Sequence, residues 1–206
     1  MQQLLQNFVR SYRMGRSVGQ DDTIKCYPRV GGCLQLGKFS LASTEVQVRC
    51  FKFLKCVTVG KYCSIGRSCF VIDANHNINF AATFPFAELG VCASAPANEL
   101  LKPTPSVQND VWIGDDAYIL AGVDVGDGAV VASNTVVTKN VPPFAVVAGN
   151  PGRIVKYRFE PDTIARFLQV KWWDLPDDVV ARQLAPLIAD PEAFLVAAEN
   201  YRRNTV

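Results

Sequence analysis

A six-residue repeat runs through the middle of the chain and restricts its fold more than any other feature. In steps of six from Val107 the chain shows only Val or Ile, and four residues after each of these positions the side chain is small or β-branched. The first series is Val107, Ile113, Ile119, Val125, Val131 and Val137, and the second is Val111, Ala117, Val123, Ala129, Thr135 and Val141. Neither the 3.6-residue period of a helix nor the two-residue period of a flat strand produces this spacing.

The repeat predicts an all-β solenoid in which each six-residue unit forms one short strand and one turn. Three units close a coil, so residues 18 apart stack, and neighbouring coils lie about 4.8 Å apart as parallel strands. The aliphatic residues point inward, because β-branched side chains suit a pleated, buried surface. We expect Gly114 and Gly126 at corners where the backbone needs unusual dihedral angles. An ordinary β-sandwich with coincidental spacing is the alternative, and the number of consecutive matching steps argues against it.

The same pattern is weaker in the first half of the chain. Val30-Gly31 and Leu36-Gly37 are six residues apart. A second series runs through Phe53, Val59, Ile65 and Val71. The segment from Ser40 to Lys52 shows no such rhythm, and the phase of the repeat changes by one residue there. We therefore expect Ile24 to Ile72 to form a less regular part of the same solenoid.

A long interruption separates the two halves. Residues 73–106 have no six-residue rhythm, and a loop of this length is usually functional or disordered. Phe80, Phe84 and Phe86 argue against disorder, and the segment holds His76, the only histidine of the chain. We expect this loop to carry function.

The organisation of the chain follows from these segments. We expect residues 1–23 to be an N-terminal segment and residues 24–160 to be the solenoid with its inserted loop. Residues 161–206 have helical patterns, with helix starts predicted near Pro161, Pro176 and Asp190. We expect these helices to cap the open end of the solenoid, because an exposed strand edge invites aggregation.

The composition of the chain excludes several classes of function. Lys and Arg number 21 and Asp and Glu 19, a net charge of +2 that gives no electrostatic case for binding nucleic acid or an anionic membrane. A single histidine excludes a multi-histidine metal site, and we expect no metal. No apolar run is long enough for a membrane span, and residues 1–19 lack the apolar core of a signal peptide. We therefore expect a soluble, reduced, cytoplasmic protein.

The seven cysteines are odd in number, and none forms a C-x-x-C pair. A zinc ribbon or thioredoxin-type site is therefore poorly supported. Cys63 and Cys69 follow aliphatic positions by four residues, which is the small interior position of the repeat. Cys33, Cys50 and Cys56 lie close to equivalent positions. We expect these cysteines to be small apolar fillers.

Three groups of residues resemble a known family. The first is Asn75-His76 with Thr83-Phe84-Pro85-Phe86, the second runs from Asn109-Asp110-Val111-Trp112-Ile113-Gly114 to Ala148-Gly149-Asn150-Pro151, and the third is Lys171-Trp172-Trp173-Asp174-Leu175-Pro176. The chain resembles the left-handed parallel β-helix (hexapeptide-repeat) acyltransferases, and within them the xenobiotic (chloramphenicol and streptogramin) acetyltransferase branch. The resemblance covers about residues 53 to 185.

The resemblance implies a left-handed coil, against the usual right-handed crossover rule. It also implies acetyl-CoA as acyl donor and a homotrimer with each active site between two subunits. Two differences leave the acceptor open: the first fifty residues match poorly, and Asn77-Ile78-Asn79 replaces a charged stretch of the antibiotic-modifying members. The acceptor hydroxyl could belong to an antibiotic or to a sugar in surface-polysaccharide biosynthesis. An amine acceptor and a longer acyl donor also remain open.

Acetyl transfer to a hydroxyl needs a base, donors for the oxyanion and an acid for the leaving thiolate. An imidazole can serve as base and acid, because its unperturbed pKa of about 6.5 is close to working pH. His76 is the candidate. Cys69 and Cys92 lie nearest to the loop, but a nucleophilic cysteine needs a paired base and a lowered pKa, and we expect neither to act as one.

The resemblance also suggests binding residues. It places the coenzyme A groove along Ala121, Gly122, Ala132, Ser133, Gly149, Asn150 and Pro151, with Trp112 beside the thioester. Arg153 and Lys156 follow at a spacing that suits the coenzyme phosphates. For the acceptor pocket we expect Tyr62, Phe84 and Phe86, whose rings can stack on a sugar or drug, with Asp73 and Asn75 orienting the loop or the acceptor.

Other functions of the same fold fit less well. A β-helix carbonic anhydrase needs three histidine ligands, and a sugar-nucleotide transferase needs a further domain for which 206 residues leave no room. A non-catalytic hexapeptide scaffold remains the alternative, but it gives no reason for a long aromatic loop with a histidine.

Overall fold

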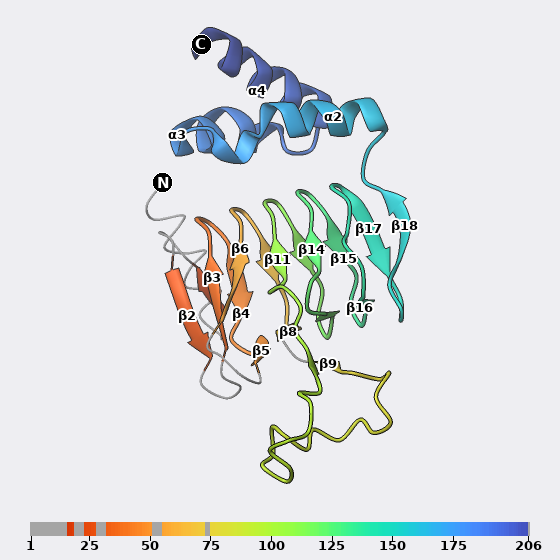
Figure 1. The fold of residues 1–206 in the computed structure, drawn as a ribbon. Helices are drawn as coiled ribbons and strands as arrows, with labels where there is room; N and C mark the ends of the chain where they lie inside the picture. Colours follow the sequence, from red (N-terminus) through yellow and green to blue (C-terminus); the bar gives the residue numbers. More distant parts are fainter. Residues whose placement is uncertain (1–15, 19–22, 28–31, 51–54, 73–74, 206) are drawn as a thin grey trace.

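The computed structural model describes residues 16–18, 23–27, 32–50, 55–72 and 75–205. In these residues the chain winds into successive coils that follow one another along a prism (Figure 1). Parallel strands pair residues 18 apart, as the repeat predicts: Val107 with Val125, Ile113 with Val131, and Ile119 with Val137. The predicted all-β solenoid is confirmed, and its left-handed winding stays a prediction.

Three sheets form the sides of the prism, and a small hairpin projects from it. Sheet A contains β1 (Arg16–Val18), β4 (Leu41–Ser43), β7 (Ser64–Ile65), β12 (Trp112–Ile113), β15 (Val130–Val131), β17 (Ala145–Ala148) and β18 (Arg153–Tyr157). Sheet B contains β2 (Thr23–Tyr27), β3 (Gly32–Leu36), β6 (Cys56–Val59), β11 (Ser106–Val107) and β14 (Asp124–Val125). Sheet C contains β5 (Gln47–Cys50), β8 (Cys69–Ile72), β13 (Tyr118–Ile119) and β16 (Val136–Val137). The hairpin pairs β9 (Asn75–His76) with β10 (Glu99–Leu100).

The chain passes from sheet B to sheet A, then to sheet C, then back to sheet B, so the prism has three rows of corners. We name them the B–A corner (for example residues 108–111), the A–C corner (114–117) and the C–B corner (120–123). The repeating aliphatic side chains fill the interior between the three sheets, and each of those in the second half is at most 3% exposed. Burial of this apolar ladder is the main force that closes the coils.

The first half of the solenoid is more regular than predicted at one place and less regular at another. Leu36, Ala42 and Val48 are fully buried at six-residue steps, so the expected irregularity from Ser40 to Lys52 is wrong for the described residues. The step after Ile65 has five residues, and Phe70, rather than the predicted Val71, fills the interior and pairs with Ile119. One large ring there replaces a β-branched residue. Val30, Gly31 and Phe53 lie outside the described residues.

The corners also differ from the expectation for glycine. Gly114 and Gly126 do not adopt positive φ angles. A Cβ atom on Gly114 would lie 2.7 Å from the backbone nitrogen of Ser133, and one on Gly126 would lie 2.7 Å from that of Pro143. Glycine is needed at these positions because the next coil approaches closely. The left-handed conformation belongs to residues three places after the aliphatic position, among them Asp110, Asp116, Gly122, Gly128 and Asn134.

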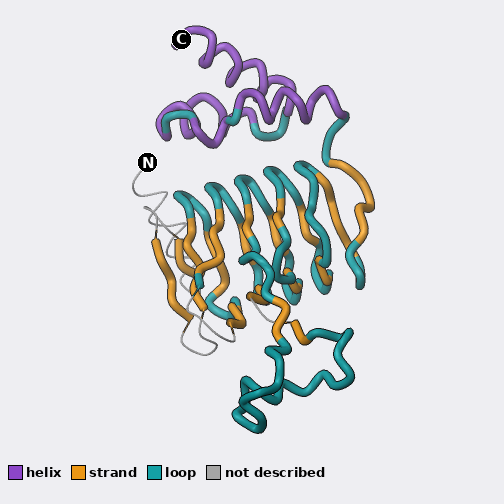
Figure 2. Tube along the Cα trace, in the orientation of Figure 1, coloured by secondary structure: helices purple, strands orange, loops and turns teal. Residues whose placement is uncertain are grey.

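Antiparallel strands, rather than helices, extend sheets A and B at the ends of the prism. β1 pairs with β4 and β2 with β3 at one end, and β18 pairs with β17 at the other. The helical segment instead lies alongside the coils, as Figures 1 and 2 show. The prediction that the helices cap the open end is therefore wrong in its placement, because the helical segment packs against Tyr62 and Lys61 at the B–A corner instead.

The C-terminal helices pack on the row of B–A corners. The segment contains α2 (Pro161–Val170), a 3₁₀ turn η1 (Trp172–Asp174), α3 (Asp177–Val179), a π-helical turn η2 (Val180–Leu184), a 3₁₀ turn η3 (Ala185–Leu187) and α4 (Pro191–Thr205). The predicted starts agree with α2, α3 and α4 to within a residue. The contact is aromatic: the ring of Tyr62 lies 4.7 Å from that of Trp172, and Phe144 lies 5.3 Å from Phe167.

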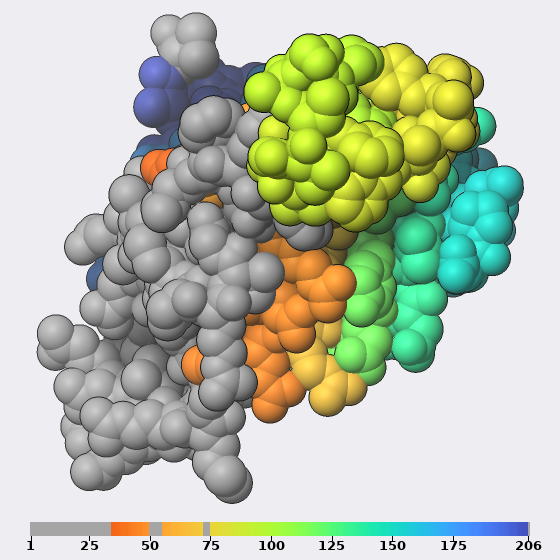
Figure 3. Space-filling view, turned by 60° about the horizontal axis from the view of Figure 1, so that its bottom comes forward, coloured from red at the N-terminus to blue at the C-terminus, as the bar shows by residue number. Residues whose placement is uncertain are grey.

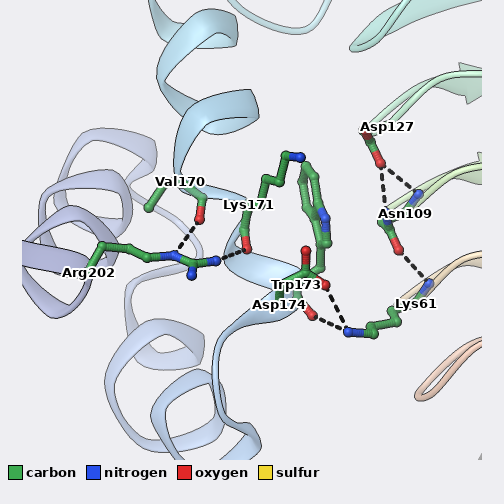
Figure 4. Close-up of polar contacts among 8 residues, drawn as sticks. All are labelled: Lys61, Asn109, Asp127, Val170, Lys171, Trp173, Asp174 and Arg202. Atoms are coloured by element: carbon green, nitrogen blue, oxygen red, sulfur yellow. Dashed lines mark hydrogen bonds and ion pairs between the residues drawn. The ribbon is translucent and has the colours of Figure 1, made fainter. Parts of the chain in front are cut away.

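Polar contacts tie the same corners to the helices (Figure 4). Asn109 accepts the Lys61 backbone N–H at 2.9 Å and donates to Asp127 at 2.9 Å, so side chains link successive coils. Lys61 Nζ lies 2.8 Å from an Asp174 oxygen, which joins this ladder to η1. Arg202 of α4 donates to the carbonyl of Val170, the last residue of α2, at 3.0 Å, and so links the two helices.

The cysteines behave as fillers in part. Cys63 and Cys69 are buried and free, as predicted, and burial raises the pKa of both thiols, that of Cys63 to about 12. Cys56 is disulfide-bonded, so the filler prediction is wrong for this residue, and the side chains of Cys33 and Cys50 lie outside the described part. No described helix has the length and apolar character of a membrane span.

Candidate active site

His76 lies at the root of the long loop. The loop leaves sheet C after β8, passes through β9, and returns through β10 to the C–B corner, where Pro103 accepts the N–H of Gly122 at 2.7 Å. His76 and Asn75 are exposed on β9. The loop stands out from the solenoid in Figure 1 and in the space-filling view of Figure 3. The lone imidazole is therefore presented to solvent at the edge of the prism.

Asn98 holds the loop together and was not found from the sequence. Its side chain accepts the N–H of Asn77 at 2.8 Å and donates to the Thr83 carbonyl at 2.7 Å, while its own N–H donates to a Glu88 oxygen at 2.8 Å. Asn98 is 2% exposed in a segment that is mostly exposed. No local pattern marks this residue, because its partners lie ten or more positions away.

The loop also carries the two aromatic residues expected in an acceptor pocket. The rings of Phe84 and Phe86 meet edge to face, with centroids 4.9 Å apart. Their exposures of 47% and 40% leave a free apolar face. The Phe86 carbonyl accepts the N–H groups of Val91 and Cys92, which keeps this part of the loop compact. Asp73, expected to orient the loop, lies outside the described residues.

Tyr62 is not part of this group. Its ring packs between Phe39, at 5.1 Å, and Trp172 on the helix-facing side of the prism. Burial, together with the Asp177 carboxylate, raises the pKa of its hydroxyl to about 12. With Asp110 and Arg158, Tyr62 lines a cavity of about 280 Å³ under the helices. Within one chain Tyr62 does not join Phe84 and Phe86, because its position in the repeat faces the B–A corner, and its place in an acceptor pocket stays a prediction.

The expected coenzyme residues fall into two regions. The first is the outer face of sheet A with the A–C corner beside it. Trp112 pairs with Val130, Val130 with Val146, and Val146 with Lys156, so these four side chains form one row across neighbouring strands. Three strand spacings of about 4.8 Å separate Trp112 from Lys156. Trp112 is 57% exposed, which leaves its indole free for a ligand.

A β-bulge brings Arg153 to the same face. Lys156 pairs with Val146 and Arg153 with Ala148, and Val155 is the extra residue between the two pairs. Residues three apart on a regular strand point to opposite faces, so the bulge lets both cations point outward. Neither cation forms an ion pair with another described residue. Two positive charges thus share one exposed surface.

The small residues divide between two corners. Ala132 and Ser133 follow β15 and Gly149-Asn150-Pro151 follows β17, so both segments lie on the A–C corner in adjacent coils. The Gly149 carbonyl accepts the N–H of Val136, at 3.0 Å, which stacks these coils. Ala121 and Gly122, in contrast, lie on the C–B corner beside the returning loop.

One chain therefore separates the parts of the expected site. The loop with His76 leaves at the C–B corner, which is the vertex opposite sheet A in a three-sided coil. Trp112, Arg153 and Lys156 lie on sheet A. Within one chain, these three residues and His76 therefore lie on opposite sides of the prism.

The two cysteines near the loop differ in burial and in the pKa of their thiols. Cys69 is buried with a raised pKa. Cys92 is exposed in the loop, and a hydrogen bond with Ser94 lowers the pKa of its thiol. Among the described residues, neither thiol forms a hydrogen bond with a histidine. Those residues also contain no cluster of three or more His, Cys, Asp or Glu side chains that could hold a metal.

Comparisons with known proteins agree with the repeat. Residues 104–139 match the bacterial transferase hexapeptide family (six repeats). A chloramphenicol acetyltransferase of Agrobacterium fabrum is 40% identical over 126 residues, which are 58% of this chain and 60% of that protein. A chloramphenicol acetyltransferase of Morganella morganii is 34% identical over 66% of this chain and 67% of that protein.

A third relative is named for a different acceptor. A probable macrolide acetyltransferase of Lysinibacillus sphaericus is 32% identical over 64% of this chain and 77% of that protein. The matched part thus spans between about three fifths and three quarters of these relatives. The chain belongs to the hexapeptide-repeat family of xenobiotic acetyltransferases, which includes the chloramphenicol acetyltransferases.

Proposed function

We propose that this protein is an acetyltransferase that moves the acetyl group of acetyl-CoA to a hydroxyl of a small acceptor, with His76 as the base. One observation carries the proposal: the only histidine of the chain is exposed on a hairpin at the root of a long, anchored, aromatic loop. The names of the relatives support the reaction class.

The proposed reaction is a direct transfer. The imidazole takes the acceptor's hydroxyl proton as the oxygen attacks the thioester carbonyl, and a C–O bond forms. Collapse of the tetrahedral intermediate breaks the C–S bond, and the imidazolium gives its proton to the departing thiolate. The products are an acetyl ester and free coenzyme A. General acid–base catalysis of this kind raises the rate about 10²–10⁴-fold. Positioning of the two substrates must supply the remaining rate enhancement.

The outer face of sheet A is the proposed coenzyme surface. Arg153 and Lys156 would bind the phosphates, because the bulge gives their charges a common direction. The pantetheine arm would lie along the small residues of the A–C corner, where a short side chain leaves the backbone accessible. Trp112 would flank the thioester end of the row.

A homotrimer would complete the site. His76 and sheet A lie on opposite sides of one prism, which supports a site in which the histidine of one copy acts on coenzyme held by another copy. Flat-sided prisms pack readily about a three-fold axis, which closes the assembly. The exposed loop would then cover the seam between two copies.

The acceptor is a hydroxyl-bearing molecule with an apolar or ring-shaped face. The free faces of Phe84 and Phe86 support such a partner, since aromatic rings stack on drug and sugar rings alike. The relatives' names favour an antibiotic-like acceptor. A polysaccharide sugar is the second candidate, because Asn77-Ile78-Asn79 replaces the charged stretch of the antibiotic-modifying members.

A thiol-release assay with acetyl-CoA and a panel of acceptors tests the proposal. We expect free thiol with at least one hydroxyl acceptor. The His76→Ala variant should turn over at least about a hundredfold more slowly while it still binds acetyl-CoA. Ser94→Ala, which alters an exposed side chain of the same loop, is the matched control and should leave turnover unchanged. No thiol release with any acceptor would favour a scaffold, and full activity of His76→Ala would reject the base.

A further inference from the structure

Glu99 stands directly opposite His76 in the pair of strands β9 and β10. The neighbouring Asn77 donates its backbone N–H to the Asn98 carbonyl at 2.8 Å, so Asn77 and Asn98 form a hydrogen-bonded pair. Hydrogen-bonded and non-hydrogen-bonded pairs alternate along an antiparallel ladder, which makes His76 and Glu99 a non-hydrogen-bonded pair. Such pairs have Cα atoms about 4.5 Å apart and bring their side chains closest.

The covalent structure of histidine decides which nitrogen the carboxylate meets. Nδ1 is bonded to Cγ and stays near the strand, whereas Nε2 is at the far end of the ring. A glutamate side chain that starts on the facing strand reaches the near nitrogen first. When a carboxylate accepts Nδ1–H, the lone pair of Nε2 is left free at the tip of the side chain. A general base at the edge of the prism needs this tautomer.

We propose that Glu99 is a positioning residue that accepts the Nδ1–H of His76 and thereby presents Nε2 to the acceptor hydroxyl. This inference rests on the proposed role of His76. Within the described residues, β10 is the strand that pairs with β9, and Glu99 is its charged residue. Of the other charged groups nearby, Glu88 accepts the Asn98 N–H at 2.8 Å, and Lys102 follows beyond the strand pair.

The single histidine makes a direct test possible, because the imidazole ¹⁵N spectrum of the labelled protein contains signals of His76 alone. Above the imidazole's titration range, we expect the Nδ1–H tautomer to predominate in the wild type. Glu99→Ala should shift the population toward Nε2–H, and Glu99→Asp should restore part of it. Glu45→Ala is the control, since Glu45 pairs with Arg67 away from the hairpin, and it should leave the spectrum unchanged. Equal tautomer populations in the wild type and Glu99→Ala would overturn the inference.

A kinetic measurement separates this inference from the proposed function. Glu99→Ala should lower kcat about tenfold or more with an unchanged KM for acetyl-CoA, and Glu99→Asp should recover most of the loss. Backbone amide signals of Asn77 and Asn98 show whether the hairpin is intact. A shifted tautomer together with full activity of His76→Ala would refute His76 as the base and keep the pairing. An unchanged tautomer refutes the pairing whatever His76→Ala does.

Discussion

Asn98 is a buried amide inside a largely exposed loop. Its polar groups reach Asn77 near the start of the loop, Thr83 before the aromatic pair, and Glu88 beyond it. A buried polar group that loses its partner costs about 1–3 kcal/mol. One side chain therefore fixes the shape of the segment that carries Phe84 and Phe86 and the direction in which β9 leaves the prism.

Removal of this amide should loosen the loop but leave the solenoid folded. We expect Asn98→Ala to raise hydrogen exchange and proteolysis throughout residues 77–98, while the melting temperature of the coils changes little, because few contacts join the loop to the core. Limited proteolysis read by mass spectrometry measures the effect. Asn79→Ala removes an exposed amide from the same loop and serves as the control. Unchanged protection in Asn98→Ala would contradict this account of the loop.

A residue's role could be predicted from the sequence where it depends on nearby residues, and could not where it depends on residues far away in the chain. His76 could be found because it is the only histidine and lies in the one long break of the repeat. Asn98 and Glu99 could not, since their importance comes from a hairpin whose strands are more than twenty residues apart in sequence. The contact of Tyr62 with Trp172 could not be predicted either, because Trp172 lies more than a hundred residues away in sequence.

At the scale of strands and turns, the β17–β18 pair has the most direct consequence for binding. The bulge at Val155 sets Arg153 and Lys156 on one face of sheet A. The repeat predicts sheet positions well where each coil has 18 residues, because every six-residue unit meets the same environment. It fails where the unit length changes, as in the five-residue step to Phe70, and it is silent about the antiparallel strands at both ends.

Neutralisation of the two cations should weaken coenzyme binding more than it slows bound-state chemistry. We expect Arg153→Gln/Lys156→Gln to raise the Kd for acetyl-CoA at least about tenfold, because even one charged contact to a phosphate contributes about 1.5–3 kcal/mol. Calorimetry measures the affinity, and single-turnover kinetics at saturating acetyl-CoA measures the chemistry. Arg182→Gln removes an exposed charge from the helical layer and should have no effect. An unchanged Kd in the double variant would place the phosphates elsewhere.

At the scale of the whole molecule, the solenoid places three surfaces on different sides of one prism. Its B–A corner is covered by helices, its C–B corner carries the loop with His76, and sheet A carries the exposed Trp112 beside two cations. The separation of these surfaces within one chain is the reason that the proposed site needs two copies.

Hybrid assemblies test this claim most directly. Differently tagged His76→Ala and Arg153→Gln/Lys156→Gln chains are co-expressed, purified through both tags, and assayed for thiol release at limiting acetyl-CoA. If the histidine of one copy acts on coenzyme held by another, each mixed trimer regains one of three sites with both parts intact, and turnover rises to about a third of the wild-type value. Hybrids no more active than either parent would contradict a site shared between copies.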